Sequence, residues 1–205
     1  ANILKKSEAL RNLNLDTITI QSHDGLKLTG YWYPAENAQR TILLVHGWRS
    51  AWHLDFGAIT PFLHQNGCNL LFIEQRSHGE SEGQYISFGV LERFDILSWV
   101  TYLKKDMNHE LPVYLFGISM GAATVLMASG LPLENQVKGI IADCGYTSAD
   151  AIIRNVLSKK KRFPIDQALS ITDHICEHHA GFKYEDYSTL NAMKCCRIPV
   201  LFIHG

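Results

Sequence analysis

A serine flanked by glycines is the position where residue types and spacing point most directly to chemistry. The segment Gly117-Ile-Ser119-Met-Gly121 follows a short apolar run, Val113 to Phe116, and precedes a stretch rich in Ala, Met and Leu. Such a run is typical of a strand buried on both faces, and the composition after it favours a helix. A strand-to-helix turn of the form Gly-x-Ser-x-Gly lifts a serine hydroxyl clear of the sheet, where it can attack an acyl carbon. The pattern predicts that Ser119 is a nucleophile; a helix-capping serine is the alternative.

The elements that must position Ser119 alternate between strands and helices. An antiparallel hairpin is predicted where residues alternate around Asp24-Gly25, and Pro61 argues for a break or a late start in the first helix of the core. Further buried strands are predicted at Arg40–Gly47, Cys68–Arg76, Val137–Asp143 and Arg197–Gly205, with the hairpin strands at Asp16–Ser22 and Leu26–Tyr33 and helices at His53–Gln65 and Val90–Lys105. This order predicts a doubly wound α/β fold, with a mostly parallel sheet and helices on both faces.

The regular alternation stops at Ser148. Amphipathic, charge-rich segments then run to about Ala192, which is too long for an ordinary connection between two core elements. We therefore expect an α/β core over residues 1–147, a helical cap over residues 148–192, and a return strand of the core over residues 193–205.

Composition excludes several classes of partner. The 205 residues are 46% hydrophobic and 19% charged, with a formal net charge of −1, so no global field attracts nucleic acid or anionic membrane. The five cysteines have neither a disulfide framework nor zinc spacing, which favours reduced thiols. No run approaches the length of a membrane span, and no secretory leader is recognisable. We expect no nucleic-acid partner, no membrane contact through this segment, and a cytoplasmic location.

Five motifs, including the one around Ser119, occur in a characteristic order. They are "LLVHGW", "IEQRSHGESEG", "GISMGA", "DCGY" and "PVLFIHG". In this order and spacing the chain resembles the α/β-hydrolase superfamily from Asp16 to Gly205. Within it, the chain is similar to cap-bearing bacterial hydrolases related to BEM46-like and serine-aminopeptidase-like proteins. The resemblance implies the α/β-hydrolase fold with a helical cap.

The resemblance also implies roles for individual residues. The backbone amides of Met120 and Trp48 would bind the oxyanion of an acyl-transfer intermediate. His46, which precedes Gly47 and Trp48, is expected to orient that loop and not to act as the base. The acyl pocket would be lined by Trp48, Tyr146 and Phe163. No metal and no cofactor is expected.

The histidine base is expected outside these residues. Partners in this superfamily follow in the order Ser, Asp or Glu, then His. The acid normally follows the strand that corresponds here to Val200–His204, and the histidine follows one βα unit later. The resemblance therefore places the triad Asp and His beyond Gly205, within about 60 further residues. We expect residues 1–205 alone to be C-terminally incomplete, nearly inactive and prone to aggregate. Asp143 is an alternative acid, although such a strand-end carboxylate more often holds a turn.

Other clusters have simpler interpretations. His174 and His178 have the i, i+4 spacing of metal ligands, but no third ligand accompanies them. The run Lys159–Arg162 could bind an acidic head group, but is typical of a solvated helix end. Three residues near the expected rim are interpreted as structural: Arg76, His78 and Gly79.

The combined expectation is a metal-free serine hydrolase. It would cleave carboxylic esters of small or medium acyl groups through an acyl-enzyme, so its partner would be a small-molecule ester. A peptidase, a lysophospholipase or a thioesterase could use the same residues. A non-catalytic binding protein with this fold remains the alternative from another class.

Overall fold

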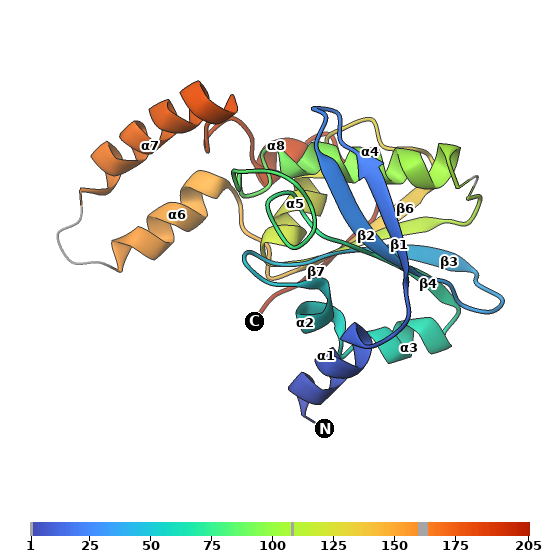
Figure 1. The fold of residues 1–205 in the computed structure, drawn as a ribbon. Helices are drawn as coiled ribbons and strands as arrows, with labels where there is room; N and C mark the ends of the chain where they lie inside the picture. The colour runs from blue at the N-terminus through green and yellow to red at the C-terminus, as the bar shows by residue number, and fades with distance from the viewer. Residues whose placement is uncertain (1, 108, 160–163) are drawn as a thin grey trace.

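The computed structural model describes residues 2–107, 109–159 and 164–205, and its secondary structure follows the predicted alternation (Figure 1). The strands are β1 (Asp16–Gln21), β2 (Lys27–Tyr33), β3 (Arg40–Val45), β4 (Cys68–Ile73), β5 (Val113–Ile118), β6 (Val137–Asp143) and β7 (Val200–Ile203). The helices are α1 (Ile3–Arg11), α2 (Trp52–Phe56), α3 (Thr60–Gln65), α4 (Glu92–Lys105), α5 (Met120–Ala128), α6 (Ala149–Ser158), α7 (Ile165–Ala180) and α8 (Thr189–Met193).

The strands form one sheet in the order β1-β2-β4-β3-β5-β6-β7. The five strands from β4 to β7 in this order run parallel, and β1 and β2 add an antiparallel hairpin at one edge. The crossing from β3 to β5 places the two strands side by side, so the loops that follow them meet at the same edge of the sheet. In open α/β sheets this carboxyl edge is where ligands bind.

Both faces of the sheet are covered by helices. Alternate residues of β3 face opposite sides: Leu43 and Val45 belong to the cluster beneath α4 and α5, while Ile42 and Leu44 belong to the cluster beneath α1 and α2. The first cluster includes the fully buried Trp99 of α4. Figure 1 shows α4, α5 and α8 on one side of the sheet and α1, α2 and α3 on the other. The doubly wound architecture predicted from the sequence is confirmed.

Two local predictions are also confirmed, and one helix was not foreseen. The Asp24-Gly25 hairpin pairs β1 with β2, and Gly25 adopts φ +90° in its turn. The predicted helical stretch His53–Gln65 is broken, because Pro61 occupies the first turn of α3 where its missing N–H is not required. The N-terminal helix α1 was not predicted. It buries only Ser7 and Leu10, so its apolar periodicity is weak.

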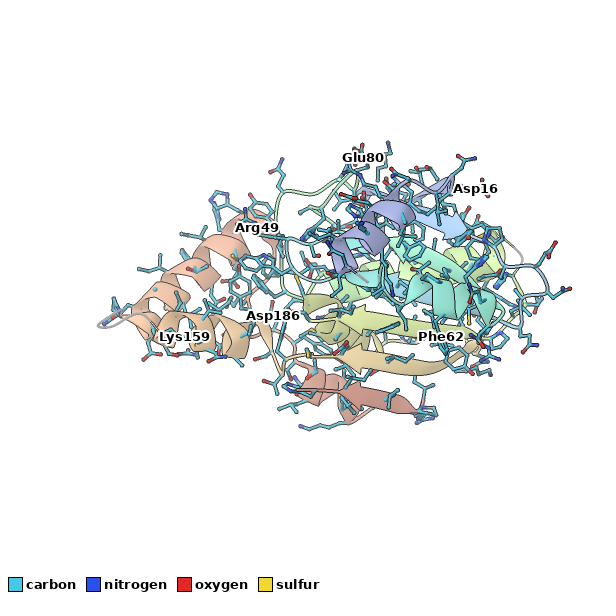
Figure 2. All side chains as sticks on the ribbon, turned by 90° about the horizontal axis from the view of Figure 1, so that it is seen from below. Asp16, Arg49, Phe62, Glu80, Lys159 and Asp186 are labelled. Atoms are coloured by element: carbon cyan, nitrogen blue, oxygen red, sulfur yellow. The ribbon has the colours of Figure 1, made fainter. Side chains whose placement is uncertain are left out.

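The segment between β6 and β7 contains three helices with different surroundings. The helices α6 and α7 form a hairpin that projects from the body beside the carboxyl edge of the sheet (Figure 1). Figure 2 places Lys159 at the far end of this hairpin and Arg49 near its base. The short α8 packs instead on α5, where Ala192 is fully buried. The division into core and cap at residues 148–192 stays a prediction.

Two further observations concern the whole described chain. All five cysteines lie among the described residues, and each is unpaired. Across those residues, the structure has no helix that is both long enough and apolar enough to cross a membrane.

Candidate active site

Ser119 lies at the turn between β5 and α5. Its backbone has φ 54° and ψ −112°, a conformation that residues with a Cβ rarely adopt. The Ser119 amide donates to the carbonyl oxygen of Asp143 at 2.8 Å, which ties the turn to the end of β6. The surrounding structure thus holds Ser119 in a strained conformation of the kind that clusters at functional sites.

The glycines on either side of Ser119 are required by packing. A Cβ at Gly121 would overlap the carbonyl oxygen of Val45, at the end of β3. A Cβ at Gly117 would overlap the backbone of Gly121 itself. The strand, the turn and the helix can approach this closely only when both positions lack a side chain. The spacing Gly-x-Ser-x-Gly therefore has a direct steric explanation here.

The loop after β3 approaches the Ser119 side chain. A Cβ at Gly47 would lie 3.4 Å from the Cβ of Ser119. Met120 is the first residue of α5, so its amide has no partner within the helix. Among the described residues, neither the Met120 amide nor the Trp48 amide donates a hydrogen bond. The N–H group of Met120, which follows Ser119, and that of Trp48, which follows Gly47, are therefore both without a partner among the described residues.

The other amides of residues 47–50 in this loop are engaged. Gly47 N–H donates to Asp55 Oδ2 at 2.7 Å, and Ser50 N–H donates to the Gly47 carbonyl at 3.3 Å. Arg49 N–H donates to His78 Nε2 at 3.1 Å. Asp55 also accepts from the Ser50 hydroxyl at 2.6 Å, so its carboxylate holds the loop at two points. Within residues 47–50, this pattern leaves Trp48 as the residue whose amide has no partner among the described residues.

His46 orients the same loop through hydrogen bonds made by both of its ring nitrogens. Its Nδ1 lies 2.8 Å from the Gly47 carbonyl, and its Nε2 accepts from the Gln75 amide at 3.2 Å. These bonds require a neutral ring with its proton on Nδ1. The Gln75 side chain donates to the His46 carbonyl at 2.6 Å and accepts from the Thr124 hydroxyl at 3.1 Å. Gln75 thus links the loop to α5, a contact that the sequence did not reveal.

Burial keeps His46 neutral over most of the pH range. The ring is fully buried, and burial lowers its pKa to about 4 from the usual value of about 6.5. Because the unfolded chain then binds more protons than the folded one, stability falls as pH decreases from about 6.5 to about 4. We expect this group to remove about 3 kcal/mol of unfolding free energy across that window.

The measurement is urea unfolding of the wild type and His46→Gln as a function of pH. The loss of stability between about pH 6.5 and pH 4 should be smaller in the variant. A His179→Gln change at an exposed position controls for the loss of one histidine from the unfolded chain. Parallel pH profiles for all three proteins would show that His46 is not the group that titrates.

Two of the residues expected to contact the acyl group, Trp48 and Tyr146, contact the ring and the backbone carbonyl of Phe88. Trp48 is 51% exposed, and its ring centroid is 5.8 Å from that of Phe88. Tyr146 donates its hydroxyl to the Phe88 carbonyl at 3.1 Å, and burial raises the Tyr146 pKa, which keeps the donor protonated. Phe163 lies outside the described residues. Phe88 was not identified from the sequence, because no motif marks it.

No base for Ser119 is formed by the described residues. The Ser119 hydroxyl and the Asp143 carboxylate make no hydrogen bond to any of them. The rings of His46 and His78 are both committed to the loop after β3. The placement of the triad Asp and His stays a prediction.

The alternative sites have structural explanations. The described residues contain one group with metal-ligand geometry, formed by His23, Asp24 and Asp95, and it does not include His174 or His178. The Arg76 guanidinium already binds Asp24 at 2.9 Å and Asp95 at 2.6 Å. Arg76 and Asp95 are each 3% exposed, so the buried Arg76 guanidinium links Asp95 of α4 to Asp24 of the hairpin. Of the charged run at residues 159–162, only Lys159 is described.

Comparisons with known proteins identify a sequence family and relatives of this chain. The sequence model of the family described as serine aminopeptidase, S33, matches residues 36–164. The uncharacterized protein YqkD of Bacillus subtilis is 29% identical over 198 residues, which cover 97% of this chain and 65% of YqkD. YfhR of Salmonella typhimurium is 33% identical over 209 residues, covering 93% of this chain and 63% of YfhR.

A solved structure shares the fold over nearly the whole chain. The Pyrococcus furiosus esterase Pf2001 is 22% identical with a TM-score of 0.71, and the match covers 98% of this chain and 72% of the esterase. Relative to the two sequence relatives, YqkD and YfhR, the chain spans slightly less than two thirds of their length. The family match includes the loop after β3 and the Ser119 turn. The chain belongs to the serine aminopeptidase S33 family of the α/β-hydrolase superfamily.

Proposed function

We propose that this protein is a serine hydrolase that cleaves carboxylic esters of small or medium acyl groups through an acyl-enzyme. One observation supports the proposal above all. The strained Ser119 lies beside two backbone amides, those of Trp48 and Met120, that have no partner among the described residues. Amides fixed in advance around a nucleophile stabilise the charge that develops on an acyl oxygen.

The reaction proceeds in two acyl transfers. The Ser119 oxygen forms a bond to the ester carbonyl carbon while a base removes the hydroxyl proton. The carbonyl oxygen becomes an oxyanion and accepts from the N–H groups of Trp48 and Met120. The tetrahedral intermediate expels the alkoxide, which receives the proton and leaves as the alcohol. Water then attacks the acyl-enzyme in the same way, and the carboxylic acid is released.

The base in this proposal is a histidine that follows Ser119 in the chain and is oriented by an acid. His46 is unsuited to the role, because its Nε2 accepts from a backbone amide and burial lowers its pKa to about 4. We propose, from the order of these groups in the superfamily, that the Asp and the His lie beyond Gly205. No cofactor enters any step.

The surroundings favour an ester with a hydrocarbon acyl group over a peptide. The half-exposed ring of Trp48 and the ring of Phe88 offer an apolar surface beside the two amides. The esterase of P. furiosus, which has the same fold, is consistent with this choice. Peptides and thioesters would use the same nucleophile, so substrate comparison decides among them.

The test is a substrate panel on the full-length gene product. We expect p-nitrophenyl acetate and butyrate to be hydrolysed with a higher kcat/KM than aminoacyl p-nitroanilides, and EDTA to have no effect. Faster turnover of the anilides would identify a peptidase instead. A folded protein without turnover of any ester, thioester or anilide would favour a binding protein.

A further inference from the structure

We propose that Phe88 limits the length of the acyl chain, and that Glu92 is the positioning residue that holds Phe88 in place. The proposal rests on the function proposed above, because it assigns the acyl side of the same site. It concerns a loop between β4 and α4 that no motif of the sequence marks as part of a binding site.

Phe88 connects the loop after β3 (residues 46–51, called the oxyanion loop because it carries the Trp48 amide) to the base of the α6–α7 hairpin. Its ring packs on Trp48 at a centroid distance of 5.8 Å and, edge to face, on Tyr184 at 5.9 Å. Tyr184 packs in turn on the buried Phe182, and its amide donates to Asp173 of α7 at 2.9 Å. The Phe88 ring therefore stands between the residue that supplies an oxyanion amide and the segment that leads out of the hairpin.

The backbone at Phe88 and Gly89 has positive φ angles, which residues with a Cβ rarely adopt. Phe88 has φ 54° and Gly89 has φ 102°. A Cβ at Gly89 would lie 2.9 Å from the sulfur of Met127 and 3.6 Å from the Cα of Thr124, so the loop is pressed against α5, the helix that begins at the nucleophile. A non-glycine residue in the left-handed region persists only where its surroundings fix it.

Glu92 stabilises this backbone conformation through hydrogen bonds. Its carboxylate accepts from Ser87 N–H and Gly89 N–H, each at 2.8 Å, and from the Ser87 hydroxyl. Glu92 and Ser87 are 1% and 0% exposed. On the other side, the Phe88 carbonyl accepts the Tyr146 hydroxyl. The peptide group after Phe88 is therefore held at both its N–H and its carbonyl, and the carbonyl of the peptide group before it accepts from Val90 N–H at 3.3 Å, so the ring has little freedom to move aside.

The direction in which the bound acyl chain extends explains how the anchored Phe88 ring limits its length. When the ester carbonyl oxygen lies between the Trp48 and Met120 amides, the acyl chain extends along the apolar surface formed by Trp48 and Phe88. The Phe88 ring is half-buried. A chain longer than the distance to Phe88 must displace a ring whose backbone is anchored, which costs more in a packed site than one extra methylene gains.

The test compares acyl-chain preference in the full-length gene product. The ratio of kcat/KM for p-nitrophenyl octanoate to that for the acetate should rise about tenfold in Phe88→Ala, because truncation opens space for the longer chain. Phe88→Leu, which keeps apolar volume, should shift the ratio in the same direction by less. Glu92→Gln should also shift it by less, since an amide cannot accept from both backbone donors and a hydroxyl as a carboxylate does.

The matched control is Phe94→Ala on α4. Phe94 has the same half-buried character, but its ring packs on His23 and Arg93, on the hairpin side of the helix. Its octanoate-to-acetate ratio should equal that of the wild type. If Phe88→Ala is unfolded by circular dichroism, the ratio in Phe88→Leu decides.

Three outcomes would overturn the proposal or part of it. An unchanged octanoate-to-acetate ratio in a folded, active Phe88 variant contradicts the proposal that Phe88 limits the length of the acyl chain. An equal loss of turnover on every ester would place Phe88 only in support of the oxyanion loop. A Glu92→Gln variant with a lower melting temperature and an unchanged ratio would contradict the positioning role. Absence of ester hydrolysis in the wild type would instead contradict the proposed function.

Discussion

Replacement of Ser119 by alanine is expected to lower kcat/KM for esters by about 10⁴- to 10⁶-fold. The variant retains the Trp48 and Met120 amides but has no oxygen to form the acyl-enzyme. Both serine and alanine carry a Cβ, so the strain at φ 54° is the same in the two proteins. The Ser119 hydroxyl makes no hydrogen bond to the described residues, so the melting temperature should change little. The measurement is steady-state kinetics alongside thermal unfolding.

Ser129→Ala provides the matched control at the other end of α5. Ser129 is 9% exposed and donates its hydroxyl to the Leu126 carbonyl at 2.7 Å, which is a structural contact. This variant should keep its activity while losing about 1 kcal/mol of stability. Comparable activity in Ser119→Ala and the wild type would contradict the nucleophile assignment.

Substitution of Gly121 by alanine is expected to cost more than about 4 kcal/mol of stability, enough to prevent folding in many domains. The added methyl group would overlap the carbonyl oxygen of Val45, which belongs to the central strand β3 and cannot move without disturbing its ladders to β4 and β5. The substitution should also abolish activity, because α5 can no longer approach the oxyanion loop. Chemical denaturation of the purified variant measures the first effect.

Gly181→Ala separates the effect of overlap from that of backbone conformation. Gly181 ends α7 with φ +69°, and a Cβ there would meet no atom within 4 Å. Its replacement should cost only about 1–2 kcal/mol, the usual penalty for a left-handed residue. A loss at Gly121 no larger than the loss at Gly181 would mean that the contact between α5 and β3 is less tight than the structure shows.

The parts of the fold that could be predicted depend on neighbours in sequence. The glycines around Ser119 and the Asp24-Gly25 turn encode their conformations within a few residues, so both were recognised. Buried parallel strands give unbroken apolar runs, which also made their order along the chain readable. The helix α1 escaped notice because only two of its residues are buried.

The parts that could not be predicted depend on contacts across long stretches of chain. Gln75 joins the oxyanion loop to α5 over separations of 29 and 49 residues, and the motif in which it lies does not reveal its partners. Phe88 is one of nine phenylalanines, and its importance arises from Trp48 and Tyr184, which belong to other elements. Side chains of this kind acquire their roles only when the sheet brings the loops together.

The claim that Ser119 is the nucleophile has a direct chemical measurement. The full-length gene product is treated with a fluorophosphonate, which forms a phosphorus–oxygen bond with an activated serine and releases fluoride. Peptide mapping by mass spectrometry then locates the adduct. We predict a single adduct on the peptide that carries Ser119, absent from Ser119→Ala and retained in Ser129→Ala. An adduct on another residue, or none on the folded wild type, would contradict the account.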